Sequence, residues 1–206
     1  MYATRVDLSL YKHTYRPEQS RLVQALWFFA GLPLLRCSFL PGSGLRCRLL
    51  RLFGAEIGKG VVIKPGVRVK YPWLLKVGDH TWIGEDCWID NLSAVHLGDH
   101  VCVSQGAYFC TGNHDWSDPA FALMVRPILV NDGAWICARA MVLPGVTVGA
   151  AAILAAGSVA TKNIPPFAIH AGNPAAYVGV RKIAGESEAQ ISSRTTDRSQ
   201  TCESFS

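Results

Sequence analysis

The 206-residue sequence contains no apolar run of the roughly 20 residues that a transmembrane helix needs. Its longest apolar run, residues 22–35, is interrupted by Gln24, Gly31 and Pro33 and is followed by Arg36. The run also starts too late for a signal peptide and lacks a clean small-residue cleavage site. We therefore expect neither a membrane span nor an export signal.

Charged residues are also scarce, and the cysteines form no Cys-x-x-Cys motif. Only 17% of the residues are charged and half are apolar, so the chain can bury a core and is not globally disordered. The seven cysteines are an odd number, and no Cys-x-x-Cys motif occurs. Without an export signal, this predicts reduced thiols in a cytoplasmic protein. Nineteen glycines and eleven prolines favour short strands and turns over long helices.

Positive charge is concentrated near the N-terminus. Residues 1–70 contain 12 Lys or Arg against 3 Asp or Glu, whereas residues 71–206 contain 8 against 12. A basic, partly apolar segment suits an anionic membrane surface or an anionic substrate. It equally suits a solvated basic face on a packed helix, and both interpretations stay open.

Aliphatic residues recur every six positions from residue 57 onward, with shifts before Val77 and Leu97 and an interruption before Val130, and this repeat organises the chain. A period of six fits short strands separated by tight turns, with the first and fifth positions of each unit directed inward. Three units would close a triangular coil of 18 residues, and four to five such coils would stack about 4.8 Å apart. The first positions are Ile57, Ile63, Val69, Val77, Ile83, Ile89, Leu97, Val103, Phe109, Val130, Ile136, Val142, Val148, Leu154 and Ala160. The small fifth-position residues include Thr81, Cys87, Ser93, Ala107, Ala134, Ala140, Ala152 and Ser158.

Residues 1–54 precede the repeat as a basic N-terminal segment, polar and irregular at first. Within it, residues 21–53 predict one or two amphipathic helices, broken near Pro33 and Pro41-Gly42. We expect residues 45–53 to cap the first coil, whose strand edges would otherwise be open. We expect the run at 22–35 to contact a membrane weakly.

The repeat domain spans residues 55–183 and has one interruption. Residues 113–127 break the six-residue period and must leave the coil as a projecting loop. Residues 184–206 are rich in Ser, Thr, Glu and Gln and predict a disordered tail.

Several segments resemble hexapeptide-repeat acyltransferases, over roughly residues 5–183. The segments are Ile83-Gly84-Glu85-Asp86-Cys87-Trp88, Val142-Leu143-Pro144-Gly145-Val146-Thr147, the run 156–166 and Ala171-Gly172-Asn173-Pro174-Ala175. The stretch Thr111-Gly112-Asn113-His114-Asp115-Trp116-Ser117-Asp118-Pro119 narrows the resemblance to the colanic-acid-type exopolysaccharide O-acetyltransferases. The resemblance implies an all-β fold: a left-handed parallel β-helix with an N-terminal helical segment and one projecting loop. Left-handed winding is an exception to the usual right-handed crossover.

The activity implied by this resemblance is acetyl-CoA-dependent O-acetylation of a sugar hydroxyl in exopolysaccharide biosynthesis, by direct transfer. An alcohol is a poor nucleophile near neutral pH, so the reaction needs a base, and His114 is the general base of the family motif. A surface histidine without a role is the alternative. A metal site would need three histidines. His96 lies 18 residues before His114 and His100 is near, but the required spacing is absent, so we expect no metal.

Acceptor contacts are predicted around the base. The resemblance assigns Asn91 to the acceptor, and Asp90 could serve instead. Asp115 and Asp118 follow the base directly, and either could orient its imidazole as the third group of a triad does. Capping of the loop is the alternative for both aspartates.

The donor site is expected in the late coils, in a groove between neighbouring subunits. The family motif places Ala138 and Ala156 beside the pantetheine arm of acetyl-CoA, and Thr161 and Lys162 beside its nucleotide. Lys162 and Arg181 could meet the phosphates as charges.

Assembly and partners follow from the same resemblance. Trp82, Trp88 and Trp135 occupy outward sixth positions, and the family forms homotrimers with shared sites, so we expect them mainly at interfaces. Trp135 could instead wall the acceptor or pantetheine site. We expect a sugar acceptor that could be lipid-linked, a cytoplasmic protein that could sit at the inner face of the membrane, and no nucleic acid. Acetylation of a small sugar or xenobiotic, or a non-catalytic β-helix that binds a partner, are the alternatives.

Overall fold

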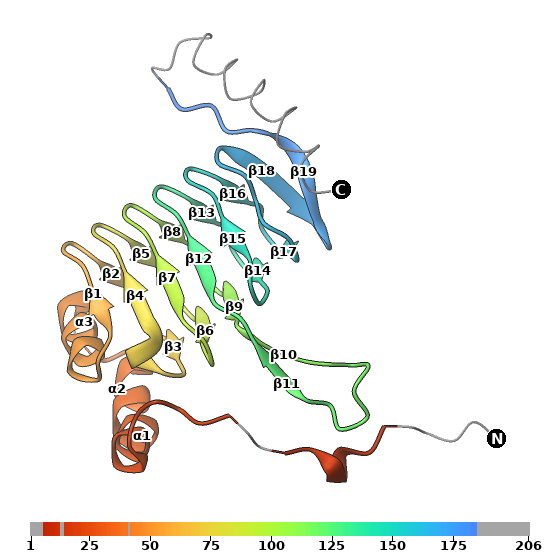
Figure 1. Cartoon of the computed structure of the whole chain (residues 1–206). Coiled ribbons are helices and arrows are strands. Elements are labelled where there is room, and N and C mark those ends of the chain that lie inside the picture. Colours follow the sequence, from red (N-terminus) through yellow and green to blue (C-terminus); the bar gives the residue numbers. More distant parts are fainter. Residues whose placement is uncertain (1–5, 13–14, 41, 185–206) are drawn as a thin grey trace.

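The repeat forms a parallel β-solenoid of about six turns in the computed structural model, which describes residues 6–12, 15–40 and 42–184 (Figure 1). Three sheets, parallel except for the last strand of one of them, make its faces, which we name A, B and C. Sheet A contains β1 (Glu56–Ile57), β4 (Leu75–Val77), β7 (Val95–Leu97), β12 (Ile128–Val130) and β15 (Thr147–Val148). Sheet B contains β2 (Val62–Ile63), β5 (Trp82–Ile83), β8 (Cys102–Val103), β13 (Trp135–Ile136), β16 (Ile153–Leu154), β18 (Ala168–Gly172) and β19 (Ala175–Val180). Sheet C contains β3 (Arg68–Val69), β6 (Trp88–Asp90), β9 (Tyr108–Cys110), β14 (Met141–Val142) and β17 (Val159–Ala160).

The six-residue period does direct its first positions inward, and every one from Ile63 to Ala160 is buried. The fifth-position prediction is wrong for Ser93, because the turns after β3 and β6 each hold two extra residues. Leu75 and Val95 occupy the inward positions there. These turns are the shifts seen in the sequence before Val77 and Leu97, and they make the early coils longer than eighteen residues. Ile57 pairs with Val77, twenty positions later, whereas Val130 pairs with Val148, eighteen positions later. The stack also exceeds the expected four to five coils.

The N-terminal helix does not break at Pro33. The segments α1 (Arg21–Leu26), η2 (Trp27–Gly31) and α2 (Leu32–Arg36) follow one another directly and form one helix. The prediction is wrong because η2 is a π-turn immediately before the proline, and such a wider turn absorbs a missing backbone donor without ending the helix. The break before residue 42 is confirmed, since α3 (Gly42–Leu52) begins there.

Both halves of the N-terminal segment pack on the first coil. Leu50 of α3 and Trp27 and Leu35 of the preceding helix are all fully buried in the core. The indole of Trp27 also donates a 3.1 Å hydrogen bond to the carbonyl of Val69. Capping by 45–53 is therefore confirmed, and the run at 22–35, expected at a membrane, has one face in the core as well.

The projecting loop is a β-hairpin of β10 (Gly112–His114) and β11 (Leu123–Val125), which extends away from the solenoid (Figure 1). The segment that contains the short 3₁₀ turn η1 (Leu8–Leu10) runs below it in this view, and Asp7 N–H donates to the carbonyl of Pro119 at 2.9 Å. A second 3₁₀ turn, η3 (Pro72–Leu74), occupies the enlarged turn after β3. At the other end of the stack, β19 pairs antiparallel with β18. The predicted tail lies outside the described residues except for its first one.

Candidate active site

The hairpin that carries His114 is fastened to the solenoid at Thr111. This residue follows β9 directly and is fully buried. Its N–H and hydroxyl both donate to the backbone carbonyl of Asp90, at 3.3 and 3.1 Å. Its own carbonyl accepts from the N–H of Arg126 on the returning strand. The base of the hairpin is thus locked to the coil below, which fixes where His114 projects.

The imidazole of His114 is held at one nitrogen. Its Nδ1 lies 2.7 Å from the backbone oxygen of Phe121, and the two rings stack with centroids 4.7 Å apart. A carbonyl oxygen only accepts hydrogen bonds, so Nδ1 carries the proton in the neutral ring. Nε2 is then the unprotonated nitrogen and can accept a proton. The arrangement fixes the tautomer that a general base requires.

The carbonyl of Phe121 is presented by a strained turn. Phe121 has a φ of +56°, in the left-handed region that a bulky residue rarely adopts. Asp118 stabilises this turn, since its two carboxylate oxygens accept from the N–H groups of Ala120 and Ala122 at 2.9 and 3.3 Å. The backbone carbonyl of Asp118 also accepts from Phe121 N–H. Asp118 therefore does not contact the imidazole as one alternative predicted, and acts on it through the backbone.

Asp115 has a local role as well. Its Oδ1 accepts from the N–H of Ser117 at 2.9 Å and from the hydroxyl of the same residue. These hydrogen bonds, the side-chain one first, lower the pKa of Asp115 below its usual value. The structure supports the loop-capping alternative for this residue rather than contact with the base.

Asn91 does not face an acceptor, which corrects the prediction for this residue. Its side chain is fully buried. Its Oδ1 accepts from the N–H of Tyr71 at 3.0 Å, and its Nδ2 donates to the carbonyl of the same residue at 2.7 Å. The amide is used to hold the enlarged turn after β3, where a buried backbone would otherwise lack partners.

Asp90 is half-buried on the outer face of sheet C. Its Oδ1 lies 2.9 Å from Nζ of Lys70, and its Oδ2 accepts from the hydroxyl of Tyr108 at 3.2 Å. Burial raises the pKa of Tyr108, with further contributions from Cys110 and Asp90. Tyr108 therefore acts here as a neutral donor.

Trp135 lies on sheet B, away from the hairpin. Its side chain is 40% exposed, and its indole N–H donates to the hydroxyl of Ser104 at 2.9 Å. The hairpin with His114 instead follows β9 of sheet C. Within one chain, the structure does not bring Trp135 and His114 together.

The predicted donor residues occupy three different corners of the solenoid. Ala138 and Ala156 lie on adjacent coils at the corner between sheets B and C, where Gly157 N–H donates to the carbonyl of Ala138. Thr161 and Lys162 are exposed at the next corner, after β17.

Arg181 lies at the third corner, apart from Lys162. Its Nη1 donates to the carbonyls of Gly133 and Ala151, at 2.8 and 3.3 Å, between sheets A and B. The guanidinium thus fastens the C-terminal strand to the coil. Because it occupies a different corner, it does not converge with Lys162 on one phosphate group in a single chain.

Two residues of the site were missed by sequence reasoning. Phe121 contributes a backbone atom, which no side-chain pattern reveals. Tyr11 lies with its ring centroid 5.9 Å from that of His114, although more than a hundred positions separate them. The spacing of eighteen residues does not bring His96 beside His114, because His96 pairs with its neighbours in sheet A. In the part of the chain that the structure describes, no three His, Cys, Asp or Glu side chains gather as a metal site would require.

Comparison with known proteins gives consistent results. No protein-family model matches the sequence. It is 40% identical over 136 residues to a protein of Escherichia coli K12 whose name, colanic acid biosynthesis acetyltransferase WcaF, is itself provisional; the match covers 66% of this chain and 75% of that protein. It is 34% identical to nodulation protein L of Rhizobium meliloti, over 60% of this chain and 69% of that one.

Solved structures agree with this. A hexapeptide-repeat acetyltransferase of Vibrio cholerae, in complex with acetyl coenzyme A, matches 85% of this chain and 97% of its own, with a TM-score of 0.72 and 25% identity. A galactoside acetyltransferase in complex with coenzyme A matches with a TM-score of 0.70 at 21% identity, over 80% and 84% of the two chains, which bears on the fold alone. The expected left-handed parallel β-helix is thereby confirmed.

Proposed function

Because the chain belongs to the hexapeptide-repeat acetyltransferase family, we propose that it transfers the acetyl group of acetyl-CoA to a sugar hydroxyl in exopolysaccharide biosynthesis. The reaction class is that of the family. The name of the E. coli relative supports the polysaccharide context, and the acetyl-CoA complex of the V. cholerae enzyme supports the donor.

His114 is the general base in this proposal, and its bond to Phe121 is the observation that carries it. The acceptor O–H bond breaks as its proton passes to Nε2, and the oxygen bonds to the acetyl carbonyl carbon. The C–S bond of the thioester then breaks, and the proton on Nε2 passes to the departing sulfur. One histidine serves as base and then as acid, so no acyl-enzyme is needed.

The corner of Ala138 and Ala156 suits a pantetheine arm. Ala156 is exposed, and a Cβ built on neighbouring Gly157 would meet no atom within 4 Å, so the backbone here is open to an approaching chain. Lys162, exposed at the next corner of the same coil, is a cation that could meet the phosphates of the nucleotide.

A homotrimer would complete the site. In one chain, the Ala138 corner and the hairpin with His114 lie at different corners of the solenoid, so a donor on one copy reaches the base of another. Sheet B offers a contact surface, since Trp82 is 58% exposed and Trp135 is 40% exposed. Burying such indoles between copies is favourable.

We place the enzyme in the cytoplasm, at the inner face of the membrane, with a lipid-linked acceptor. Among the described helices, none has the length and apolar character to cross a bilayer. The helix 21–36 nevertheless leaves Leu22, Leu26 and Phe29 at 70%, 50% and 86% exposure, on the side opposite its buried residues. Residues 15–54 contain six arginines and one acidic residue, which suits an anionic surface.

The proposal is tested with purified protein, acetyl-CoA and a panel of free and lipid-linked sugars. Thiol release should depend on the acceptor, and the product should gain the mass of one acetyl group. Thiol release without any acetylated sugar, or no reaction with any sugar, would refute sugar O-acetylation.

A further inference from the structure

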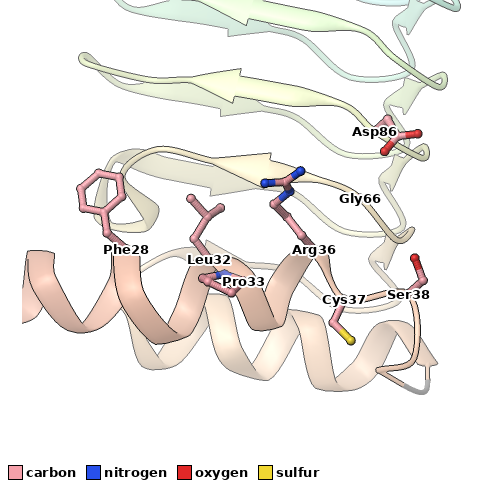
Figure 2. A pocket seen from close by; sticks show the side chains of 8 residues that line it. All are labelled: Phe28, Leu32, Pro33, Arg36, Cys37, Ser38, Gly66 and Asp86. Carbon is pink, nitrogen blue, oxygen red and sulfur yellow. The ribbon is translucent and has the colours of Figure 1, made fainter.

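A groove crosses the outer face of sheet C beside the helix 21–36. It consists of two adjoining clefts of about 490 and 220 Å³, which share Phe28 and Leu32 as lining residues. Figure 2 shows these two side chains and Arg36 projecting from the helix toward the coils, with Asp86 across from them. The larger cleft falls in the range of about 300–1,000 Å³ that ligand sites usually occupy.

The smaller cleft is lined by two aromatic rings, Phe28 and Trp88. The ring of Trp88 is held by Tyr108, with ring centroids 4.7 Å apart, and the Arg68 guanidinium lies 4.4 Å from its centroid. Phe28 is fixed by an edge contact with Tyr71. These contacts immobilise the two rings that line the cleft before any ligand arrives.

The larger cleft presents polar groups that lack partners. Across residues 6–12, 15–40 and 42–184, neither the guanidinium of Arg36 nor the carboxylate of Asp86 makes a hydrogen bond or ion pair. Asp86 lies over Gly66, where a Cβ would collide with the carboxylate, so the glycine makes room for it. The carbonyl of Arg36 accepts from Gly66 N–H, which fixes the helix end against the coil.

The groove leads toward the base. Its inner end is lined by Lys70 and Asp90, and Asp90 pairs in register with Cys110 of β9. The chain continues from β9 through Thr111 into β10 and His114. A ligand with its reacting end at His114 could therefore extend over this face to Arg36.

We propose that this groove binds the acceptor as an oligosaccharide, in a subsite that holds sugar residues beyond the one that is acetylated. The inference rests on the proposed function. Pyranose rings offer an apolar face to the ring of Phe28. Their hydroxyls can accept from the Arg68 guanidinium that lies over Trp88, and their hydroxyl pairs fit the planar groups of Arg36 and Asp86. A lipid chain fits this groove less well. The smaller, apolar cleft lies at the end of the groove nearer the base, and charged residues of the coils border that cleft.

The test uses oligosaccharides prepared from the deacetylated exopolysaccharide of the producing strain, fractionated from monosaccharide to hexasaccharide. The wild-type kcat/KM should rise with acceptor length. Phe28→Ala and Asp86→Asn should each lower kcat/KM for the hexasaccharide about 3- to 10-fold and leave the monosaccharide unaffected. Matched controls are Phe39→Ala, which removes a ring that is 94% exposed, and Glu85→Gln, which removes the carboxylate next to Asp86.

Equal losses for all lengths, or equal effects of the control variants, would overturn the subsite. Direct titration of the hexasaccharide into wild type and Asp86→Asn, by calorimetry without acetyl-CoA, separates this result from the proposed function. If no fraction is acetylated, the proposed function fails. In that case the oligosaccharide subsite stands only if calorimetry shows that the hexasaccharide binds wild type more tightly than Asp86→Asn.

Discussion

His114 receives its orientation from the backbone of Phe121, seven positions further along the same hairpin, through a 2.7 Å hydrogen bond at Nδ1. A backbone acceptor cannot ionise, so it fixes the tautomer at every pH at which the imidazole is neutral. The orientation of the base therefore depends on the geometry of the turn and not on a second ionisable side chain.

Replacing His114 by alanine should lower kcat by about 10²- to 10⁴-fold, the usual contribution of general acid–base catalysis. Acetyl-CoA binding, measured by calorimetry, should not change. His96→Ala removes an exposed histidine of sheet A and should keep wild-type activity. Near-normal turnover in His114→Ala would exclude this residue from the mechanism.

Asp118 should act as a positioning residue. Asp118→Ala removes the acceptors for Ala120 and Ala122, so the Phe121 turn should relax and kcat should fall about 10- to 100-fold, with KM for acetyl-CoA unchanged. Nitrogen NMR of the His114 ring should show a smaller fraction of Nδ1–H. Asp118→Asn keeps one acceptor oxygen and should restore part of the rate. An unchanged ring spectrum together with a lower kcat would contradict the positioning role.

Asn91→Ala should reduce stability rather than catalysis. It leaves the buried N–H of Tyr71 unpaired and removes one of the two hydrogen bonds that the Tyr71 carbonyl accepts, which costs about 1–3 kcal/mol in the free energy of unfolding. Urea unfolding measures this cost, and Asn131→Ala, at an exposed position, is the matched control. A stable Asn91→Ala protein with a raised KM for the acceptor would instead restore its predicted role in binding.

Membrane contact should depend on the exposed stripe of the helix 21–36. The intact protein should float with vesicles that contain anionic lipid, less so at high salt. Deleting the helix would remove Trp27 and Leu35 from the core, so Phe29→Glu is the better test, with Val178→Glu as the control on β19. Equal flotation of wild type and Phe29→Glu would exclude this stripe as the contact.

The repeat region could be predicted because each buried residue occupies a fixed place in the six-residue period. A period of six can be read directly from residues such as Leu97, Val103 and Phe109, and all are buried. The two enlarged turns appear in the sequence only as shifts of this period before Val77 and Leu97, and a shift does not tell which residue of the turn points inward. Ser93 was misplaced for this reason.

The base was predictable from its motif, whereas its environment was not. Phe121 acts through a carbonyl, and Tyr11 reaches His114 only because the N-terminal segment runs along the hairpin. The position of Asn91 in the motif predicted a contact with the acetyl acceptor, but in the structure its buried amide bonds the backbone of Tyr71. Such long-range contacts depend on the path of the chain, which local patterns do not specify.

The polarity of the final strand also limits the growth of the stack. Each coil presents unpaired backbone groups to the next, so an uncovered end could recruit a coil from another molecule and begin a fibre. Helix α3 lies over β1 and β2 at one end. At the other end, β19 runs antiparallel to β18, so a further coil would have to continue from a strand of reversed direction. The reversed strand thus opposes end-to-end addition of a coil at the end of sheet B.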